Sequence, residues 1–404
     1  MKQCYICINE KPFDGSVFVT QIADWVNMFV ANGLPYKYYQ MYTVQNYFKK
    51  TWKAEQIKKI KSILPCFQGA FVSFPSHGLL AALNARIIYR NIKKEIKGFE
   101  QVVIFSRALN GFEIPYLRKL IPVPVKFVYD ARGCSYEEHK YSILKNQQFD
   151  KKHFDLLSHI NLVETLTVRK TDKVFAVSNV LIKYLSHNSG MPKEKFFLYP
   201  CLSDGSKFFY DKEIRTEIRK ELGFETNHRV FLYAGGLKNA YHVSSETLVF
   251  MNEVAATDEN ARFLLLSKDM LGEEEIMLQY PNLHGKIVMS SVPNNEMYKY
   301  LNAADYGLLF RENVPMNNVA SPSKFAEHVL CGLPTIISDG VGDYSELCEK
   351  EKLGIMIVGS KATESDLIKL KHISFDRDAI AQYGRDHLSK QSHIKAVVNE
   401  FEDL

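Results

Sequence analysis

The chain has 404 residues, which is enough for two domains of ordinary size. Apolar residues make up 46% of it and charged residues 24%, as in soluble globular proteins, and no apolar run is long enough to span a bilayer. Residues 1–9 are too short and too polar for a secretory signal, and the seven cysteines lack the paired spacing of a metal site, so we expect a protein of a reducing cytoplasm.

The formal net charge of +5 conceals a difference between the two halves. Residues 1–200 contain 29 Lys and Arg against 15 Asp and Glu, a net charge of +14, whereas residues 201–404 contain 22 against 31, a net charge of −9. A basic first half favours an anionic acceptor or a membrane surface as partner. No nucleic-acid module or basic-aromatic signature is present, so no nucleic acid is expected as a partner.

Short apolar runs alternate with helical patterns along the first 200 residues. Helices are predicted up to about residue 32, then over 47–64, 79–96 and 137–169, and again after the cap Ser178-Asn179. Strands separated by helices indicate a parallel, doubly wound sheet. The predicted strands of this half span residues Gln3–Asn9, 38–44, 70–74, 102–106, 125–129, 174–177 and 196–199.

The most basic element of this half runs from Tyr47 to Leu64, YFKKTWKAEQIKKIKSIL. Such a pattern is typical of a helix that lies in a membrane interface, and equally of a surface helix that covers the sheet. The sequence leaves both interpretations open. The apolar residues can share one face, and the lysines spread around it: Trp52, Ile57, Ile60 and Leu64, with Lys53, Lys58, Lys59 and Lys61.

A break between two domains is predicted in the polar loop 200–211, after which a second alternation begins. Neither half contains G-x-G-x-x-G after a strand, which disfavours a dehydrogenase. We predict an α/β fold with domains at 1–200 and 201–385, followed by a C-terminal helix at 386–404, since the last thirty residues have a helical pattern. The strands predicted in the second half span 230–234, 263–266, 286–289, 307–310, 335–338 and 355–358.

Ligands of open parallel sheets bind beyond the carboxyl ends of the strands, and two such domains that face each other form a cleft, the usual place for a ligand. This rule selects the candidate residues of both halves. They are Gly15, Arg107, Asp130, Arg132 and Gly133 in the first, and Gly235, Gly236, Lys238, Arg311 and the helix that starts at Ser321 in the second.

The segment 321–344, SPSKFAEHVLCGLPTIISDGVGDY, reads as a helix followed by a strand. Ser321, Pro322 and Ser323 offer a hydroxyl for the cap and a proline for the first turn. A helix N-terminus beside a strand end suits a phosphate; Lys324 adds a charge there, and Glu327, three residues on, could accept both hydroxyls of a ribose. An ordinary capped helix with a solvated Lys–Glu pair is the alternative.

This segment resembles the donor-site signature of glycosyltransferase family 4, retaining enzymes of the GT-B fold. In that signature Ser-Pro-x-Lys-Phe-x-Glu-Tyr precedes Cys-Gly-Leu-Pro, and His328 stands here where tyrosine is usual. The resemblance implies that Glu327 binds the donor ribose, and that Lys324 and nearby backbone amides bind the diphosphate. It also implies two Rossmann-like domains facing across a cleft, with a C-terminal helix that crosses back onto the first.

Further positions of the chain resemble the same family. Gly15 resembles its flexible glycine loop, although a plain turn explains Asp-Gly equally well. Arg107 and the run Asp130-Ala131-Arg132-Gly133 resemble acceptor-side positions of a polysaccharide-assembling branch, and an Asp–Arg surface pair is the alternative. The run NAADYGLLFR resembles the lead-in to the donor site, and its Arg311 could neutralise phosphate with two hydrogen bonds.

Two departures from the family concern the donor. Many members carry Glu-x7-Glu, but Val319 stands eight residues before Glu327. Many also carry Gly-Arg after the first strand of the second domain, where this chain has Gly235-Gly236-Leu237-Lys238. Lys324 must then neutralise the diphosphate, with help from Lys238 or Arg311. Contacts to the donor sugar would come from Asn317, Asn318 or main-chain amides.

The resemblance implies a retaining transferase that moves a sugar from a nucleoside diphosphate to a glycan or lipid-linked glycan acceptor in cell-surface polysaccharide synthesis. Catalytic roles are expected for Arg107, Asp130, Arg132 and Lys324. No metal or other cofactor is expected, because helix ends and basic side chains can stabilise a leaving diphosphate. The segment Asp376-Arg377-Asp378 reads as a helix start.

The protein is expected in the cytoplasm, peripheral on the inner face of the plasma membrane. A sugar-nucleotide epimerase on a GT-B-like fold is a second interpretation of the sequence. A non-catalytic glycan- or membrane-binding module is a third.

Overall fold

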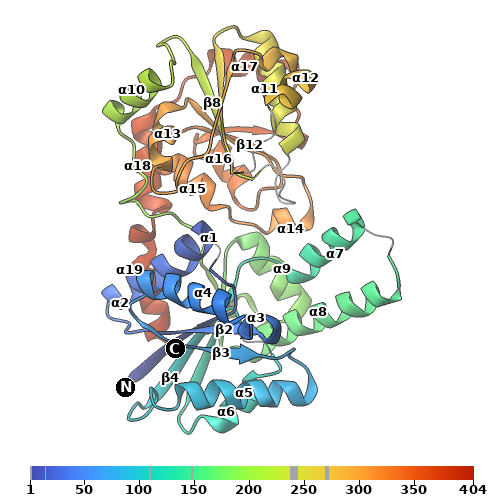
Figure 1. Cartoon of the computed structure of the whole chain (residues 1–404), viewed down its shortest axis with the longest axis vertical. Helices are drawn as coiled ribbons and strands as arrows, with labels where there is room; N and C mark the ends of the chain where they lie inside the picture. The colour runs from blue at the N-terminus through green and yellow to red at the C-terminus, as the bar shows by residue number, and fades with distance from the viewer. Residues whose placement is uncertain (1, 14, 109–110, 147–148, 237–243, 269–272) are drawn as a thin grey trace. The chain divides into compact units, whose positions relative to one another are not determined.

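The chain forms two compact units, each built on one parallel sheet (Figure 1). The computed structural model describes all residues except 1, 14, 109–110, 147–148, 237–243 and 269–272. The first unit comprises Met1–Pro200 and His393–Leu404, and the second comprises Cys201–Ser392.

The first sheet has seven parallel strands in the order β3-β2-β1-β4-β5-β6-β7. Its direction of winding reverses between β1 and β4, which pair from Gln3 opposite Gln101 to Ile8 opposite Ser106. Such a reversal is the place where open α/β sheets bind ligands. The strands are β1 (Gln3–Asn9), β2 (Lys37–Thr43), β3 (Phe67–Ser73), β4 (Gln101–Ser106), β5 (Val125–Ala131), β6 (Lys173–Ala176) and β7 (Phe196–Leu198).

Helices cover both faces of this sheet (Figure 1). Their ends follow local signals: the hydroxyl of Ser178 caps α9 by accepting the N–H of Leu181, and Gly190, at φ 68°, ends it. The helices are α1 (Ser16–Phe18), a helical segment Val19–Ala23, α2 (Asp24–Ala31), α3 (Val44–Tyr47), α4 (Lys50–Ile63), α5 (Gly78–Ile92), α6 (Ile114–Leu120), α7 (Ser135–Asn146), α8 (Lys151–Lys170), α9 (Asn179–Ser189) and the turn Lys193–Lys195.

The C-terminal residues complete the core of the first unit. Helix α19 (Lys390–Glu402) places Phe401 in an aromatic cluster, with its ring centroid 4.9 Å from that of Phe175, 5.3 Å from Phe29 and 5.4 Å from Phe105. Phe401 is fully buried. Packing of this kind is worth more than the buried area alone, because the rings meet at tilted and edge-on angles.

The second sheet has six parallel strands in the order β10-β9-β8-β11-β12-β13, and its winding reverses between β8 and β11. Alternate residues of β8 enter different cores: Phe231 and Tyr233 pack on one face, and Val230 and Leu232 on the other. The strands are β8 (Arg229–Ala234), β9 (Ala261–Leu266), β10 (Ile287–Ser290), β11 (Tyr306–Leu309), β12 (Thr335–Ser338) and β13 (Gly354–Ile357).

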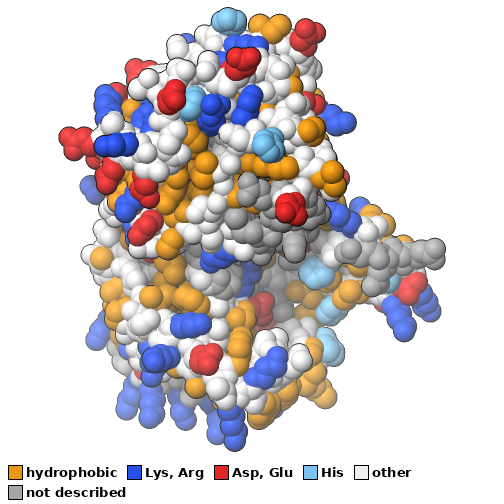
Figure 2. All heavy atoms as spheres, turned by 45° about the horizontal axis from the view of Figure 1, so that its top comes forward, with side chains coloured by type: hydrophobic (Ala, Val, Ile, Leu, Met, Phe, Trp, Pro, Cys, Tyr) orange, Lys and Arg blue, Asp and Glu red, His pale blue; other side chains and the backbone are white. Residues whose placement is uncertain are grey.

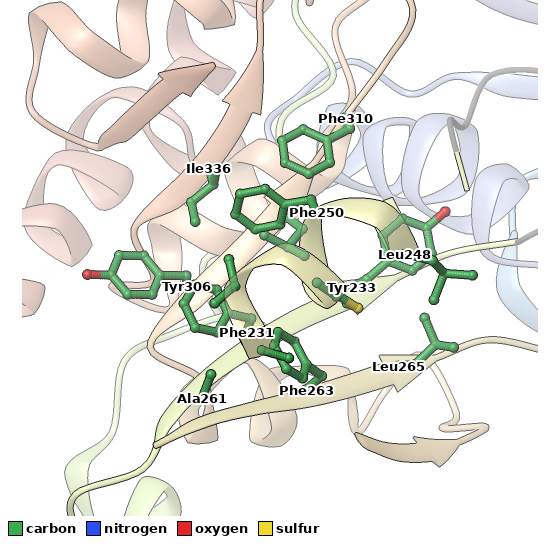
Figure 3. Close-up of a cluster of buried hydrophobic side chains, with 14 of the residues drawn as sticks. Phe231, Tyr233, Leu248, Phe250, Ala261, Phe263, Leu265, Tyr306, Phe310 and Ile336 are labelled. Atoms are coloured by element: carbon green, nitrogen blue, oxygen red, sulfur yellow. The ribbon is translucent and has the colours of Figure 1, made fainter. Parts of the chain in front are cut away.

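The larger core of this unit is aromatic, as Figure 3 shows for one face of the sheet. The ring of Phe231 stacks between those of Phe263 and Tyr306, at centroid distances of 5.6 Å and 5.1 Å. The helices are α10 (Lys212–Glu221), α11 (Ser244–Thr257), α12 (Glu273–Gln279), α13 (Met297–Ala303), α14 (Pro315–Asn318), α15 (Ser323–Leu330), α16 (Tyr344–Lys350), α17 (Glu364–His372) and α18 (Arg377–His387), with turns at Pro281–Leu283 and Val358–Ser360.

The α/β fold with two doubly wound parallel sheets is confirmed. Each strand predicted from the sequence is present, and its ends differ from the prediction by three residues at most. Buried strands of a parallel sheet read as continuous apolar runs bounded by polar loops, which makes them easy to recognise.

Three predicted helices are divided in the structure. The helix expected over 137–169 is two helices, α7 and α8, because Asp150 caps α8 by accepting the N–H of His153. The basic helix expected from 47 to 64 begins only after Lys49, whose backbone is not helical. The last thirty residues form α18 and α19, separated where Ser389 pairs with Ser203.

We predict that Phe401→Ala destabilises the first unit by about 3–5 kcal/mol, since it leaves a cavity in a fully packed aromatic cluster. Both tryptophans of the chain, Trp25 and Trp52, lie in this unit, so tryptophan fluorescence during urea unfolding reports on it selectively. Phe48→Ala is the control, because Phe48 is 69% exposed and its loss should cost less than about 0.5 kcal/mol. Equal midpoints for the two variants would contradict the structural role of Phe401.

Candidate functional site

The candidate donor site lies at the winding reversal of the second sheet. Gly235 and Gly236 follow β8, and Arg311 follows β11 after one residue. The N-terminus of α15 contributes Lys324 to the same place: a Cβ atom added to Gly235 would lie 2.4 Å from the Lys324 Nζ. Three predicted site elements, from separate parts of the chain, are therefore brought together.

Lys324 is a cation surrounded by protein. Its Nζ lies 5.9 Å from the ring centroid of Tyr233, whose hydroxyl donates to the Gly236 carbonyl at 3.1 Å. Burial lowers the pKa of Lys324 to about 8; Glu327 opposes this shift, and the like charge of Arg311 adds to it. A lysine with a lowered pKa beside a second cation at a strand end is an arrangement that an anion would stabilise.

The backbone of Arg311 is fixed by two hydrogen bonds. The Ser338 hydroxyl, at the end of β12, accepts the N–H of Arg311 at 2.8 Å and donates to its carbonyl at 2.9 Å. The guanidinium also opposes the rise in pKa that burial causes in Tyr233. Its charge therefore acts on the same small region as that of Lys324.

Glu327 lies one turn further along α15 and is 9% exposed. It accepts a hydrogen bond from the Ser323 hydroxyl at 3.2 Å. Burial raises the pKa of Glu327, while Lys324, the Ser323 hydrogen bond and Lys390 oppose the rise. The solvated Lys–Glu pair that the sequence allowed is disfavoured, because Glu327 is enclosed and Lys324 is half-buried.

The start of α15 differs from the prediction. The helix begins at Ser323, with Pro322 as its N-cap and no side-chain cap. The expected cap, Ser321, uses its hydroxyl within the fold: it accepts the N–H of Cys201 at 3.0 Å and donates to the Tyr344 hydroxyl at 3.0 Å. The N-terminus of α15 is therefore not closed by a serine side chain.

The residues predicted to contact the donor sugar occupy different environments. Asn317 is fully buried, and its amide donates to the Glu312 carbonyl at 3.0 Å, which places it inside the loop. Asn318 is half-buried and lies against the turn after β12, since a Cβ on Gly340 would meet its Oδ1 at 2.6 Å. Val319, where the family carries a carboxylate, is a core residue.

His328, which replaces the usual tyrosine, is a core residue as well. Its Nδ1 lies 3.2 Å from the Thr335 hydroxyl, and its ring fills the space beside Gly307, where a Cβ would meet Nδ1 at 2.5 Å. Burial lowers the pKa of His328 to about 3, and Lys324 contributes. This histidine is neutral and structural. Lys238 lies outside the described residues.

In the first unit, three predicted site residues form a buried ion-pair network. Arg107 and Arg132 both contact the carboxylate of Asp130, Arg132 at 2.6 Å, and the three side chains are 8%, 11% and 2% exposed respectively. The Arg107 guanidinium also donates to the Gln21 carbonyl at 2.9 Å, and that of Arg132 lies 4.5 Å from the Tyr199 ring centroid. The surface pair considered from the sequence is wrong, since these charges are buried.

Two predicted site positions of the first unit favour glycine for different physical reasons. Gly15 has φ 87°, a conformation that side chains disfavour, and an added Cβ would meet nothing. Gly133 lies against Glu138, whose Oε1 an added Cβ would approach to 2.4 Å.

Sequence reasoning missed Tyr233, Glu10 and Glu164. Glu10 directly follows β1, so the strand-end rule would have selected it. Tyr233 and Glu164 carry no local signal, because the contacts that distinguish them come from other elements.

Within the described residues, no group of three or more His, Cys, Asp or Glu side chains could hold a metal ion.

None of the helices described combines the length and apolar composition needed to cross a bilayer.

No protein-family model and no curated protein sequence matches the chain, whereas solved structures share its fold. Anabaena HepE in complex with UDP is 11% identical over 99% of this chain and 100% of that one, with a TM-score of 0.66, and its UDP-glucose complex has a TM-score of 0.65. A glycosyltransferase from Rickettsia africae is 13% identical over 99% and 98%, with a TM-score of 0.65.

The N-terminal domain of Candida albicans trehalose-6-phosphate phosphatase is 12% identical over 100% of this chain and 97% of that one, with a TM-score of 0.64. At these identities the likeness shows the fold alone, which is the GT-B type.

We predict that nucleotide binding weakens as the pH rises through about 8, the pKa of Lys324. In the free protein, Lys324 loses its proton in this pH range. In the complex Lys324 keeps the proton, because the negative charge of the diphosphate favours the charged form of its side chain. The Kd of UDP, measured by calorimetry, should rise about tenfold between pH 7 and pH 9. Lys324→Arg is the matched control, since arginine stays protonated, and an equal rise in that variant would contradict the assignment.

Proposed function

We propose that the protein is a glycosyltransferase that transfers a sugar from a nucleoside diphosphate to an acceptor. The observation that carries this proposal is the pair of cations, Lys324 and Arg311, at the winding reversal of the second sheet, beside the N-terminus of α15 and with Glu327 on the same helix. The likeness to HepE, solved with UDP and with UDP-glucose, supports a nucleotide-sugar donor.

In this proposal the diphosphate binds between Lys324, Arg311 and the N-terminus of α15, and Glu327 accepts hydrogen bonds from the ribose hydroxyls. Negative charge grows on the diphosphate as the bond to the sugar breaks. The ammonium and the helix dipole stabilise that charge, which lowers the barrier to departure. Because Gly235 has no side chain, the Lys324 ammonium has room at the strand end.

Membership of glycosyltransferase family 4, a retaining outcome with front-face attack, and a role in cell-surface polysaccharide synthesis belong to the same proposal. They rest on the resemblance of the segment 321–344 and of Asp130-Ala131-Arg132-Gly133. The acceptor would then be a glycan or lipid-linked glycan bound by the first unit, with Arg107, Asp130 and Arg132 fixing the wall beside it.

The test is incubation of the protein with UDP-glucose and other nucleotide sugars, with and without an acceptor panel. Transfer to an acceptor supports the proposal. Isomerised donor formed without acceptor would identify an epimerase instead, and tight nucleotide binding without any turnover would identify a binding module.

Glu327→Gln is expected to weaken UDP-glucose binding by about 1.5–3 kcal/mol, or about 10- to 150-fold in Kd, because the ribose loses a charged hydrogen-bond acceptor. Calorimetry measures this directly. Glu349→Gln is the control, since Glu349 is exposed on α16 and makes the same change of charge. Unchanged affinity in Glu327→Gln would remove this residue from the donor site.

Transfer is expected to persist in EDTA, because the proposed site neutralises the diphosphate with Lys324 and the helix N-terminus. Lys324→Ala should lower kcat by about 10²–10³-fold and raise KM far less, since its charge acts mainly on the transition state. Activity that is abolished by EDTA and restored by Mg²⁺ or Mn²⁺ would show that an ion holds the diphosphate.

A membrane surface is proposed as a further partner, bound by electrostatics. The apolar side of α4 faces inward: Ile60 and the C-cap residue Leu64 are fully buried, and the ring centroids of Trp52 and Tyr42 lie 5.5 Å apart. The lysines remain outside, and Figure 2 shows Lys and Arg side chains gathered along the lower edge of the first unit. Anionic headgroups can therefore be attracted, but the apolar face of α4 is not available for insertion.

Replacing Lys53, Lys58, Lys59 and Lys61 with Gln should reduce binding to vesicles containing phosphatidylserine, by about 1 kcal/mol per charge near the surface. Co-sedimentation at low ionic strength measures this. The control replaces four exposed lysines outside α4 with Gln and removes the same charge: Lys93, Lys94, Lys97 and Lys119. Equal loss in both proteins would reject α4 as the contact surface.

A further inference from the structure

The first unit contains a cavity at the carboxyl ends of its strands. Its volume is about 590 Å³, within the range of small-molecule sites. All of its lining residues belong to the first unit, and they follow or end the strands β1 to β5, while α7 and α8 form one wall. The cavity therefore lies at the winding reversal between β1 and β4, where ligands of such sheets bind.

A buried carboxylate on α8 faces this cavity with one oxygen unsatisfied. Glu164 is 5% exposed, and its Oε1 accepts the N–H of Ser135 at 2.7 Å. Its Oε2 is buried and has no hydrogen-bond partner among the described residues. Burial raises the pKa of Glu164 to about 7, and Glu138 and Glu137 add to the rise. A native fold rarely keeps such an atom unpaired, so a ligand that donates a hydrogen bond is expected there.

A second carboxylate lines the same cavity from the end of β1. Glu10 is exposed, yet burial raises its pKa to about 7; Glu113 adds to the rise and Lys11 opposes it. The cavity thus offers two hydrogen-bond acceptors on different elements, and each of them has another carboxylate nearby.

The arginine of the lining is already engaged. Arg107 is the cation among the described lining residues, and its guanidinium pairs with Asp130 and donates to Gln21. His139 uses its Nδ1 on the Ser135 carbonyl at 2.8 Å. An acidic ligand would therefore meet two carboxylates in a cavity whose arginine is already paired.

Aromatic rings complete the lining. Phe74, after β3, and Tyr129, in β5, are both half-buried at the cavity. Rings beside a few hydrogen-bonding groups suit a sugar, which presents C–H groups on its faces and hydroxyls at its edge.

We propose that this cavity binds a non-acidic sugar unit of the acceptor, through hydroxyl or amino groups that donate to Glu164 and Glu10, and that it rejects acidic sugars. The identification of the ligand as the acceptor rests on the proposed transferase function. The inference concerns only the sugar unit in the cavity, and the charge of the first half still favours an anionic group elsewhere on the acceptor.

The experiment titrates the full chain with three methyl glycosides by ligand-observed NMR. The probes are methyl α-glucoside, its 2-amino-2-deoxy analogue and methyl α-glucuronide. The first two should bind at least about tenfold more tightly than the glucuronide, because only the last brings a negative charge to the carboxylates. Equal or tighter binding of the glucuronide, or no binding of any probe, would overturn the proposal.

Glu164→Gln tests the assigned oxygen. The Gln oxygen can keep the Ser135 contact, while the amino group replaces Oε2, so an acceptor becomes a donor without a change of shape. Binding of the glucoside and the amino glucoside should weaken about tenfold, and Glu10→Gln, at a position reached by solvent, should act in the same direction. Glu217→Gln, on the exposed side of α10, is the control. Unchanged affinities in both cavity variants would refute the site.

UDP binding by the same samples separates this inference from the proposed function. If UDP binds and the glycosides do not, the cavity proposal fails and the donor site stands. If the glycosides bind in the expected order and UDP does not, the donor site fails and the sugar-binding cavity stands.

Discussion

The second unit depends on holding the Lys324 ammonium next to the charge of Arg311 in an enclosed place. The cost of this arrangement is visible in the pKa of Lys324, which burial lowers to about 8. The surrounding structure maintains it: Ser338 fixes Arg311 from both backbone groups, and Gly235 leaves the space that Nζ needs. Under the proposed function, a bound diphosphate would offset the repulsion between these two cations.

The positions of the strands, and with them the fold, could be predicted because buried parallel strands leave continuous apolar runs. The strand-end rule and the i, i+3 spacing of Lys324 and Glu327 then predicted residues that the structure brings together or encloses. Helix ends were predicted less well, although Asp150 has an evident capping position. The sequence predicts Ser321 as the cap, because no local pattern shows that its hydroxyl makes hydrogen bonds with Cys201 and Tyr344.

The remaining site residues depend on contacts that no local pattern encodes. His328 departs from the family tyrosine, and its reason is Gly307 on a neighbouring strand, which leaves room for the ring. Asn317 reads as an available amide but is buried under its own loop. Glu164 lies in a polar helix of unremarkable composition, and it becomes special only because α7 brings Ser135 to one of its oxygens and leaves the other unpaired.

Net charge and cavity chemistry act over different distances in the first unit. The 29 basic residues of the first half lie mostly toward water, where charges are screened beyond about 10 Å, so they attract an acceptor toward the surface without deciding which group it inserts. Inside the cavity the nearest groups decide, because the effective dielectric is lower there and the two carboxylates Glu164 and Glu10 line it. One acceptor can satisfy both conditions: a lipid-linked glycan whose phosphate meets the basic surface and whose terminal sugar carries no acid. Under the proposed function, the basic surface and the cavity would then recognise two parts of one molecule.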